Sequence, residues 1–201
     1  MKYVPHEYQS YATQFILDHP VAAILLQMGL GKSVITLTAI RELLEKGETR
    51  RVLVIAPLRV ARDTWPEEIR KWDHLKGMTY SVAVGTADER RKALAVSSQV
   101  TLINRENVPW LVEASVLQHG KCLPCYSRPT LQGPAEARLD NGDRRPASAG
   151  GGKIPFDYDM IVIDELSSFK NWEAKRFRAL MKVRPLVKRI VGLTGTPSPN
   201  G

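Results

Sequence analysis

Short apolar runs alternate along the chain with segments in which apolar residues recur every three or four positions. The runs favour strands because they are brief and rich in β-branched residues, and they occupy residues 21–26, 51–56, 80–84, 99–103, 158–163 and 189–193. Helical patterns occupy residues 11–17, 34–44, 64–72, 89–92 and 167–180. This alternation predicts an α/β fold with a mainly parallel sheet flanked by helices. We expect the run at 21–26 to be a buried strand.

Two of the expected helices start with the spacing of a capping box, in which a hydroxyl residue is followed three positions later by a glutamate. Thr64 and Glu67 have this spacing, with Pro66 in the first turn, and Thr86 and Glu89 repeat it. The sequence therefore predicts that helices begin at Thr64 and Thr86.

Regular patterns fail between residues 114 and 153, where prolines and a glycine-rich run interrupt the chain. We predict an irregular insertion here. His119, Cys122 and Cys125 have ligand-like spacing, but a tetrahedral zinc site needs a fourth ligand and no second Cys/His pair follows. A thioredoxin-like redox site would have its cysteines between a strand and a helix, so neither reading of the cysteines is favoured.

A glycine-rich loop lies between the first apolar run and the helical pattern that follows it. Its sequence is Met28-Gly29-Leu30-Gly31-Lys32-Ser33. The two glycines free the backbone to wrap around phosphate with its N–H groups. Lys32 is placed to reach the β- and γ-phosphates of a nucleotide, and the Ser33 hydroxyl to coordinate a bridging Mg²⁺. Strand, loop and helix in this order predict a site for Mg-ATP.

Two adjacent carboxylates, Asp164 and Glu165, follow the apolar run at 158–163. Asp164 is placed to hold Mg²⁺, and Glu165 to orient and deprotonate the water that attacks the γ-phosphate. Without the glycine-rich loop, the pair would be equally compatible with a solvated turn.

Three further side chains are candidates for contacting the nucleotide. The Gln9 amide offers both a donor and an acceptor, as the edge of adenine requires, although a solvated glutamine at a helix start is the plainer alternative. Thr194 and Thr196 follow the last strand, where their hydroxyls can sense the γ-phosphate or simply form a turn.

The charge of the chain favours an anionic partner. Its 201 residues suit one domain, and a formal net charge of +8 favours nucleic acid over membrane because no long apolar segment is present. The N-terminal residues contain no apolar signal core, which argues for a cytosolic protein of a bacterium or a phage-infected cell. The candidates for contacting DNA are Pro57, Arg59, Arg105 and Lys170. An arginine at a loop start can equally well be solvated or paired locally.

Several short motifs occur together in the order found in helicases. They are Tyr8-Gln9, Met28 to Ser33, Ala56-Pro57, Asp164 to Ser167, Lys170-Asn171 and Leu193 to Pro197. By these motifs the chain resembles the first RecA-like lobe of superfamily II helicases, closest to the Swi/Snf-type DNA translocases and their phage-encoded relatives. The resemblance implies a P-loop NTPase lobe over residues 1–201 that binds ATP and Mg²⁺ and serves translocation on double-stranded DNA.

The chain departs from the pattern of that family at three places. Leu26-Gln27 replaces the acidic residues that commonly precede the loop, and Leu166-Ser167 replaces a small residue and a histidine that helps couple the ATP site to motif III. The second RecA-like lobe and its arginine finger, expected after motif III, would have to come from a longer chain or another subunit. The isolated lobe is therefore expected to hydrolyse ATP weakly or not at all.

Two other functional classes compete with this reading. A degenerate lobe could keep the fold and the basic surface as a non-catalytic DNA-binding module. A small P-loop kinase would share the glycine-rich loop, but it would need an acceptor pocket, for which no motif is present. Nucleotide binding separates the first alternative from the ATPase, because a ligand of the native state must stabilise it.

Overall fold

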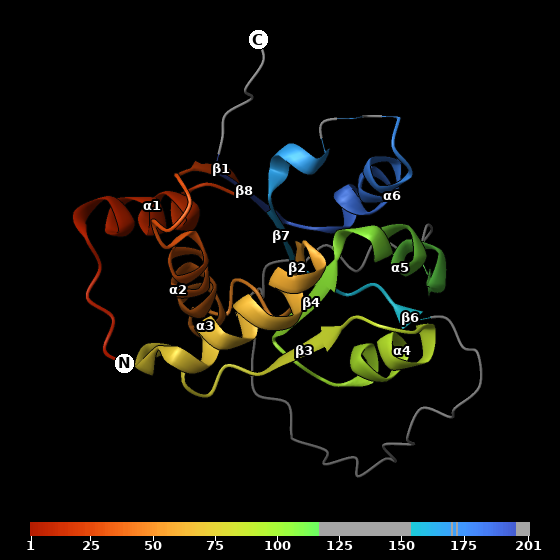
Figure 1. Cartoon of the computed structure of the whole chain (residues 1–201), viewed down its shortest axis with the longest axis horizontal. Coiled ribbons are helices and arrows are strands. Elements are labelled where there is room, and N and C mark those ends of the chain that lie inside the picture. The colour runs from red at the N-terminus through yellow and green to blue at the C-terminus, as the bar shows by residue number, and fades with distance from the viewer. Residues whose placement is uncertain (117–153, 170, 172, 196–201) are drawn as a thin grey trace, which may run out of the picture.

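A computed structural model of the protein describes residues 1–116, 154–169, 171 and 173–195 (Figure 1). Within these ranges a six-stranded sheet has the order β1-β8-β7-β2-β4-β3, and every neighbouring pair is parallel. Its strands are β1 Val21–Leu25, β2 Val52–Ala56, β3 Tyr80–Ala83, β4 Val100–Asn104, β7 Met160–Asp164 and β8 Arg189–Thr194. The predicted α/β class and parallel sheet are confirmed.

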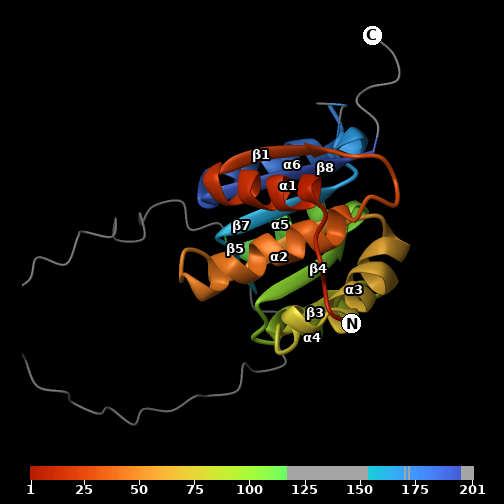
Figure 2. The same cartoon turned by 90° about the vertical axis from the view of Figure 1, so that its left-hand side faces the viewer.

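Helices cover both faces of this sheet, as Figures 1 and 2 show. On one face lie α1 Glu7–Asp18, α2 Lys32–Glu45 and α3 Trp65–Lys71, and on the other α4 Ala87–Ala95, α5 Val108–Ala114 and α6 Lys175–Val183. Side chains alternate between the two faces along each strand, so Val54 packs into the first core and Ile55 into the second. Both residues are fully buried, which explains why the central strands are continuous apolar runs.

The prediction of a buried first strand is wrong. Strand β1 lies at the edge of the sheet, where it pairs only with β8. Its residues are alternately exposed and buried, and Val21 and Leu25 are 60% and 53% exposed. One face of the strand packs on the helices while the other stays open.

The two predicted capping boxes have different outcomes. Thr86 begins α4 as expected, since Thr86 N–H donates to Glu89 Oε2 at 2.7 Å and Glu89 N–H donates to Thr86 Oγ1 at 3.3 Å. Thr64 does not cap a helix. It has helical backbone angles of −66° and −51°, because a helical segment starts earlier, at Leu58, and passes through a π-helical turn at Val60–Thr64 before α3.

The basic helix also starts later than predicted. Residues Leu166–Phe169 form a short 3₁₀ turn, and α6 begins only at Lys175. Helix α5 and its preceding 3₁₀ turn, Arg105–Asn107, were not predicted at all.

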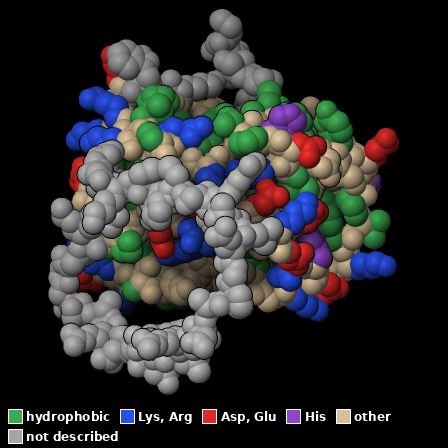
Figure 3. Space-filling model, turned by 180° about the vertical axis from the view of Figure 1, so that it is seen from behind, with side chains coloured by type: hydrophobic (Ala, Val, Ile, Leu, Met, Phe, Trp, Pro, Cys, Tyr) green, Lys and Arg blue, Asp and Glu red, His purple; other side chains and the backbone are tan. Residues whose placement is uncertain are grey.

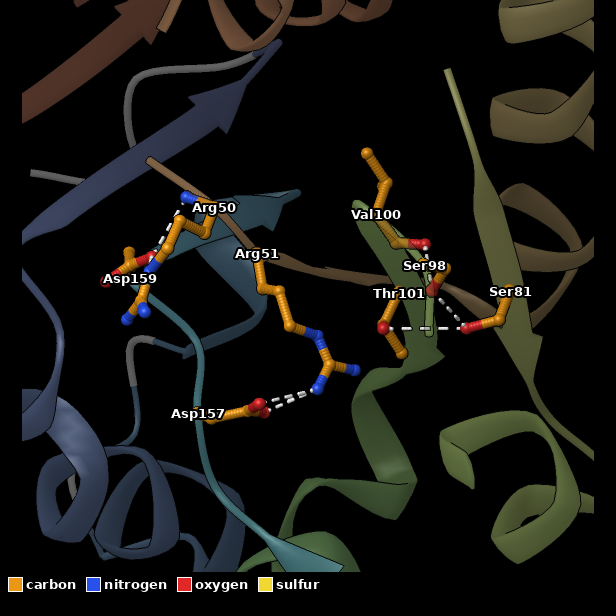
Figure 4. A network of polar contacts seen from close by, with 8 residues as sticks. All are labelled: Arg50, Arg51, Ser81, Ser98, Val100, Thr101, Asp157 and Asp159. Atoms are coloured by element: carbon orange, nitrogen blue, oxygen red, sulfur yellow. Dashed lines mark hydrogen bonds and ion pairs between the residues drawn. The ribbon is translucent and has the colours of Figure 1, made fainter. Parts of the chain in front are cut away.

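Ion pairs and hydroxyl contacts fix the amino-terminal edge of the sheet (Figure 4). Arg51 Nη1 lies 2.6 Å from Asp157 Oδ1, and Asp159 Oδ2 accepts from Arg50 N at 2.9 Å. Burial by itself would raise the pKa of Asp159, but the hydrogen bonds and charges of Arg50 and the charge of Lys188 outweigh it and lower that pKa. These contacts join the starts of β2 and β7. The glycine-rich loop and the pair Asp164-Glu165 follow the other ends of their strands, so they lie at the opposite edge of the sheet.

A second, two-stranded sheet lies where the predicted insertion begins and ends. Strands β5 Ser115–Val116 and β6 Ile154–Pro155 pair in parallel, so the described residues on either side of the predicted insertion lie next to each other. The ligand-spaced residues His119, Cys122 and Cys125 lie outside the described residues. No helix in the described part of the chain is long and apolar enough to span a membrane.

Candidate nucleotide-binding site

The loops that follow β1 and β7 lie beside the end of β8 at the carboxyl edge of the sheet. Leu26 N–H donates to Thr194 O at 3.2 Å, which joins the start of the glycine-rich loop to the end of β8. In the next strand pair Asp164 lies opposite Leu193. Parallel strands place their carboxyl ends on one side, where ligands of open α/β sheets bind. The structure therefore brings together the loop, Asp164 and Thr194, as the sequence predicts.

Both glycines of the loop have left-handed backbone angles. Gly29 has a φ of 83° and Gly31, which is the N-cap of α2, a φ of 79°. A Cβ added to Gly29 would meet no atom within 4 Å, whereas one added to Gly31 would lie 2.7 Å from Gln9 Nε2. Gly29 is therefore needed for its backbone conformation, and Gly31 for both its conformation and its close contact with Gln9.

Lys32 lies in the first turn of α2 and folds back over the loop. Its Nζ donates to Leu26 O at 2.8 Å and to Gln27 O at 3.0 Å. An ammonium group has three donors, so one remains for a phosphate oxygen. A Cβ built on Gly195 would lie 3.8 Å from the same Nζ, which puts this lysine beside the end of β8 as well.

Two side chains of α1 bind the glycine-rich loop directly. Gln9 Nε2 and Tyr8 Oη both donate to Leu30 O, at 3.3 and 3.4 Å. Gln9 Oε1 accepts from His6 N at 3.0 Å, and the residue is buried. The alternative of a solvated glutamine is therefore wrong. In this structure Gln9 spans the helix start and the loop, while its contact with a base stays a prediction.

Asp164 ends β7 and is held by a tryptophan from another element. The indole Nε1 of Trp65 donates to Asp164 Oδ2 at 2.9 Å. Burial raises the pKa of Asp164, against the opposing effects of the Trp65 hydrogen bond and the positive charge of Lys32. A partly buried carboxylate near a cation fits the hard-oxygen chemistry of Mg²⁺.

The neighbouring Glu165 has an unusual backbone conformation. Its φ of 64° makes it the sole residue other than glycine with positive φ in the described chain. Its Oε1 accepts a hydrogen bond from Ser167 Oγ. The side chain of Leu166 instead packs on β8, so that a Cβ added to Gly192 would lie 2.7 Å from Leu166 Cδ2. The departure Leu166-Ser167 thus replaces the family's histidine by one apolar and one hydroxyl contact.

The remaining candidate residues are only partly placed. Ser33 follows Lys32 in the first turn of α2, Met28 is 85% exposed at the loop, and Thr194 is buried. Thr196 and Lys170 lie outside the described residues.

The loop candidates for DNA contact also lie at this carboxyl edge. Arg59 is exposed at the start of the helical segment after Pro57. Arg105 is half-exposed, and its Nε donates to Glu106 Oε1 at 2.8 Å, so the alternative of local pairing holds for this arginine. On the face drawn in Figure 3, basic and acidic side chains are interspersed. On the part of that face formed by the described residues, charge alone therefore marks no binding surface.

Sequence reasoning names Tyr8 and Ser167 only as parts of motifs and does not single out Trp65, so it missed the contacts that all three make. Trp65 and Ser167 contact the two predicted carboxylates, Asp164 and Glu165, and Tyr8 contacts the loop. The spacing of Ser167 from Glu165 was the one available signal, because a hydroxyl two residues away can reach a side chain locally. Among the described residues, no three or more His, Cys, Asp or Glu side chains gather in a group that could hold a metal ion.

Comparison with known families decides the assignment of the chain. The model of a family described as SNF2-related domain matches residues 18–201. The chain belongs to this family. Among solved structures, the SNF2-related chain is similar to the Sulfolobus solfataricus SWI2/SNF2 ATPase core in complex with dsDNA, with a TM-score of 0.68 and 20% identity over 98% of this chain. A second structure of that ATPase core domain gives a TM-score of 0.58 and 20% identity over 94% of this chain. These likenesses confirm the RecA-like fold.

A curated relative is closer in sequence. It is "Putative protein p41" of Acyrthosiphon pisum secondary endosymbiont phage 1, and it is 33% identical over 99% of this SNF2-related chain. The chain spans 37% of that relative, and 33% and 31% of the two solved chains, so it corresponds to about a third of each.

Proposed function

We propose that this chain is the ATP-binding lobe of a DNA-dependent translocase, which binds Mg-ATP and hydrolyses it when a second RecA-like lobe completes the site. The observation that carries the proposal is the convergence of Lys32 and Asp164 at the edge of the sheet where the glycine-rich loop ends. Membership of the SNF2-related family supports it further.

The nucleotide would be held mainly by the loop. Gly29 and Gly31 shape the backbone for phosphate, and Lys32 has one ammonium donor left for it. Ser33 and Asp164 would hold Mg²⁺, which supplies positive charge that neutralises the phosphates. Gln9 and Thr194 border the same loop, which supports their assignment to the base and the γ-phosphate.

Glu165 would act as the general base. Its carboxylate lies next to Asp164 in the chain and is oriented by the Ser167 hydroxyl. Holding a carboxylate in one orientation favours deprotonation of a water at a fixed place. Thr196 would complete motif III, through which the phosphate state is reported to the neighbouring lobe.

DNA would be bound at the same carboxyl edge, through the exposed Arg59, the half-buried Pro57 and, after release from Glu106, Arg105. Lys170 is the further candidate. The solved relative at TM-score 0.68 holds dsDNA, which supports a duplex as the partner. The net charge of +8 is consistent with contacts to phosphate. We expect the protein to work in the cytoplasm of a bacterium or phage-infected cell.

Thermal unfolding with and without Mg-ATP tests nucleotide binding. Binding at 100 times the dissociation constant should stabilise the native state by about 2.7 kcal/mol. Lys32→Ala should abolish the stabilisation, while Lys46→Ala, at the exposed end of the same helix, should keep it. If millimolar Mg-ATP stabilises neither the unmodified chain nor the control, while DNA binding persists, the non-catalytic DNA-binding module is correct.

Turnover is tested in a form of the protein that contains both lobes. Duplex-stimulated ATP hydrolysis should be lost in Lys32→Ala and in Glu165→Gln, with nucleotide binding retained in the second variant. Glu113→Gln, which alters an exposed glutamate of α5, serves as the matched control. Unchanged turnover in Glu165→Gln would refute the role of Glu165 as the base.

A further inference from the structure

Trp65 is a core residue whose indole N–H also forms a hydrogen bond with Asp164, in addition to the apolar packing of its ring. Among the described residues it is the largest fully buried side chain, with 0% of its surface exposed. Its indole carries a single polar atom, a donor, and that atom points at Asp164 Oδ2 from 2.9 Å. The two residues are 99 positions apart in the chain, so the bond joins α3 to the end of β7.

The indole of Trp72, the residue that follows α3, provides a comparison. Trp72 Nε1 also donates to a carboxylate, Glu68 Oε2, at 2.6 Å, but that glutamate is only four positions away on α3. Both bonds are partly buried, but the Trp72 bond is local, whereas the Trp65 bond joins α3 to the carboxylate at the end of β7 that would hold the metal. Trp65 is thus distinguished by its partner and not by the type of bond.

The backbone around Trp65 is also specialised. Trp65 N–H donates to Val60 O, five residues earlier, which closes the π-helical turn. Such turns are rare and occur frequently at functional sites. Ala61 and Ile69, on either side, are buried in the same core, so the indole is held by packing as well as by its hydrogen bond. A rigid donor of this kind fixes the carboxylate it binds.

We propose that Trp65 is a positioning residue, whose indole N–H occupies Asp164 Oδ2 and so turns Oδ1 toward the Mg²⁺ of the bound nucleotide. The inference rests on the proposed function of the site. Partners that orient a metal-binding carboxylate in this way typically contribute 10–100-fold to metal affinity or activity. Trp65 need not touch nucleotide or metal itself.

The test measures how strongly Mg²⁺ improves nucleotide binding, as the ratio of the ADP dissociation constants in EDTA and in Mg²⁺. Trp65→Phe removes the donor and keeps an aromatic ring, and it should lower this ratio by about 10–100-fold. Its affinity for ADP in EDTA should stay unchanged, because the loop is intact. Trp72→Phe, which removes the local indole bond, should leave both constants unchanged.

The outcomes separate this inference from the proposed function. A full Mg²⁺ effect in Trp65→Phe overturns the positioning role while leaving the nucleotide site in place. Equal loss of affinity with and without Mg²⁺ also overturns it, because that result indicates general damage to the fold. If the unmodified chain shows no Mg²⁺-dependent binding, the proposed function itself fails.

A second measurement covers the case in which Trp65→Phe does not fold. The indole ¹⁵N–¹H resonance of Trp65 can be assigned in the unmodified chain by elimination, with phenylalanine variants of Trp72, Trp110 and Trp172. Mg-ADP should shift this resonance more than metal-free ADP does, and Asp164→Ala should shift it more than the other three. An indole signal that responds to neither change overturns the proposal.

Discussion

Gly31→Ala tests the closest contact of the glycine-rich loop. A residue with a Cβ at a φ of 79° costs about 1–2 kcal/mol relative to glycine. The new methyl group would also lie 2.7 Å from Gln9 Nε2 and must displace it from Leu30 O, a hydrogen bond worth about 1 kcal/mol. The free energy of unfolding should therefore fall by about 2–3 kcal/mol.

Two other glycines separate the backbone effect from the contact. Gly29 and Gly47 have φ values of 83° and 70°, and a Cβ on either would meet nothing within 4 Å. Alanine at each should cost only the backbone penalty of about 1–2 kcal/mol. The stiffening of the unfolded chain by alanine is common to all three variants and cancels in the comparison.

Urea unfolding at equilibrium measures these differences. Gly31→Ala should be about 1 kcal/mol less stable than Gly29→Ala, and this excess should vanish in a Gln9→Ala background. Both loop variants should lose stabilisation by Mg-ATP, whereas Gly47→Ala should keep it. Equal stability of Gly31→Ala and Gly29→Ala would refute the contact with Gln9.

Two further predictions concern the rest of the sheet. Gly192→Ala should lower the free energy of unfolding by about 1–3 kcal/mol, because the added methyl group overpacks against Leu166. Adding Leu166→Ala to the same chain should recover part of this loss. If urea unfolding shows no recovery, the packing of Leu166 on Gly192 is contradicted. Because its folded pKa is lowered, Asp159 stabilises the protein above its unfolded pKa of about 3.9, and this stabilisation is lost as the pH falls through the lower folded value. Asp159→Asn should therefore be less stable than the unmodified chain at pH 7, and it should lose less stability between pH 5 and pH 2. Asp157→Asn, which alters an exposed carboxylate, is the control. If Asp159→Asn leaves the acid dependence of stability unaltered, the role of Asp159 is disproved.

The sequence predicted the parts of the fold that depend on local pattern. The central strands are apolar on both faces, so their runs stand out, and the loop and the two carboxylates follow strand ends directly. Thr86 caps its helix as expected because Glu89 completes the reciprocal pair. In each of these cases, residues that are close in the sequence are sufficient to predict the local structure.

The features that were missed depend on contacts between distant parts of the chain. Nothing in the run from Val21 to Leu25 distinguishes an edge strand from a central one, because strand order is decided by pairing with β8. The threonine of the failed capping box lies inside a helix that begins at Leu58, and a π turn has no periodic pattern of its own. The indole that holds Asp164 is likewise invisible to spacing rules, since 99 positions separate the partners.

The π-helical turn makes the length of one short segment as important as its composition. Removing one residue between Val60 and Trp65 would shorten the span from the Trp65 N–H to Val60 O from five residues to four, the spacing of an α-helix, and so would remove the π-helical turn. Exposed side chains within the turn, such as Arg62, can be exchanged without this effect. A homologue with one residue fewer here would therefore lack this π-helical turn. The number of residues from the end of β2 to this tryptophan is thus a marker by which homologues sharing this arrangement can be recognised.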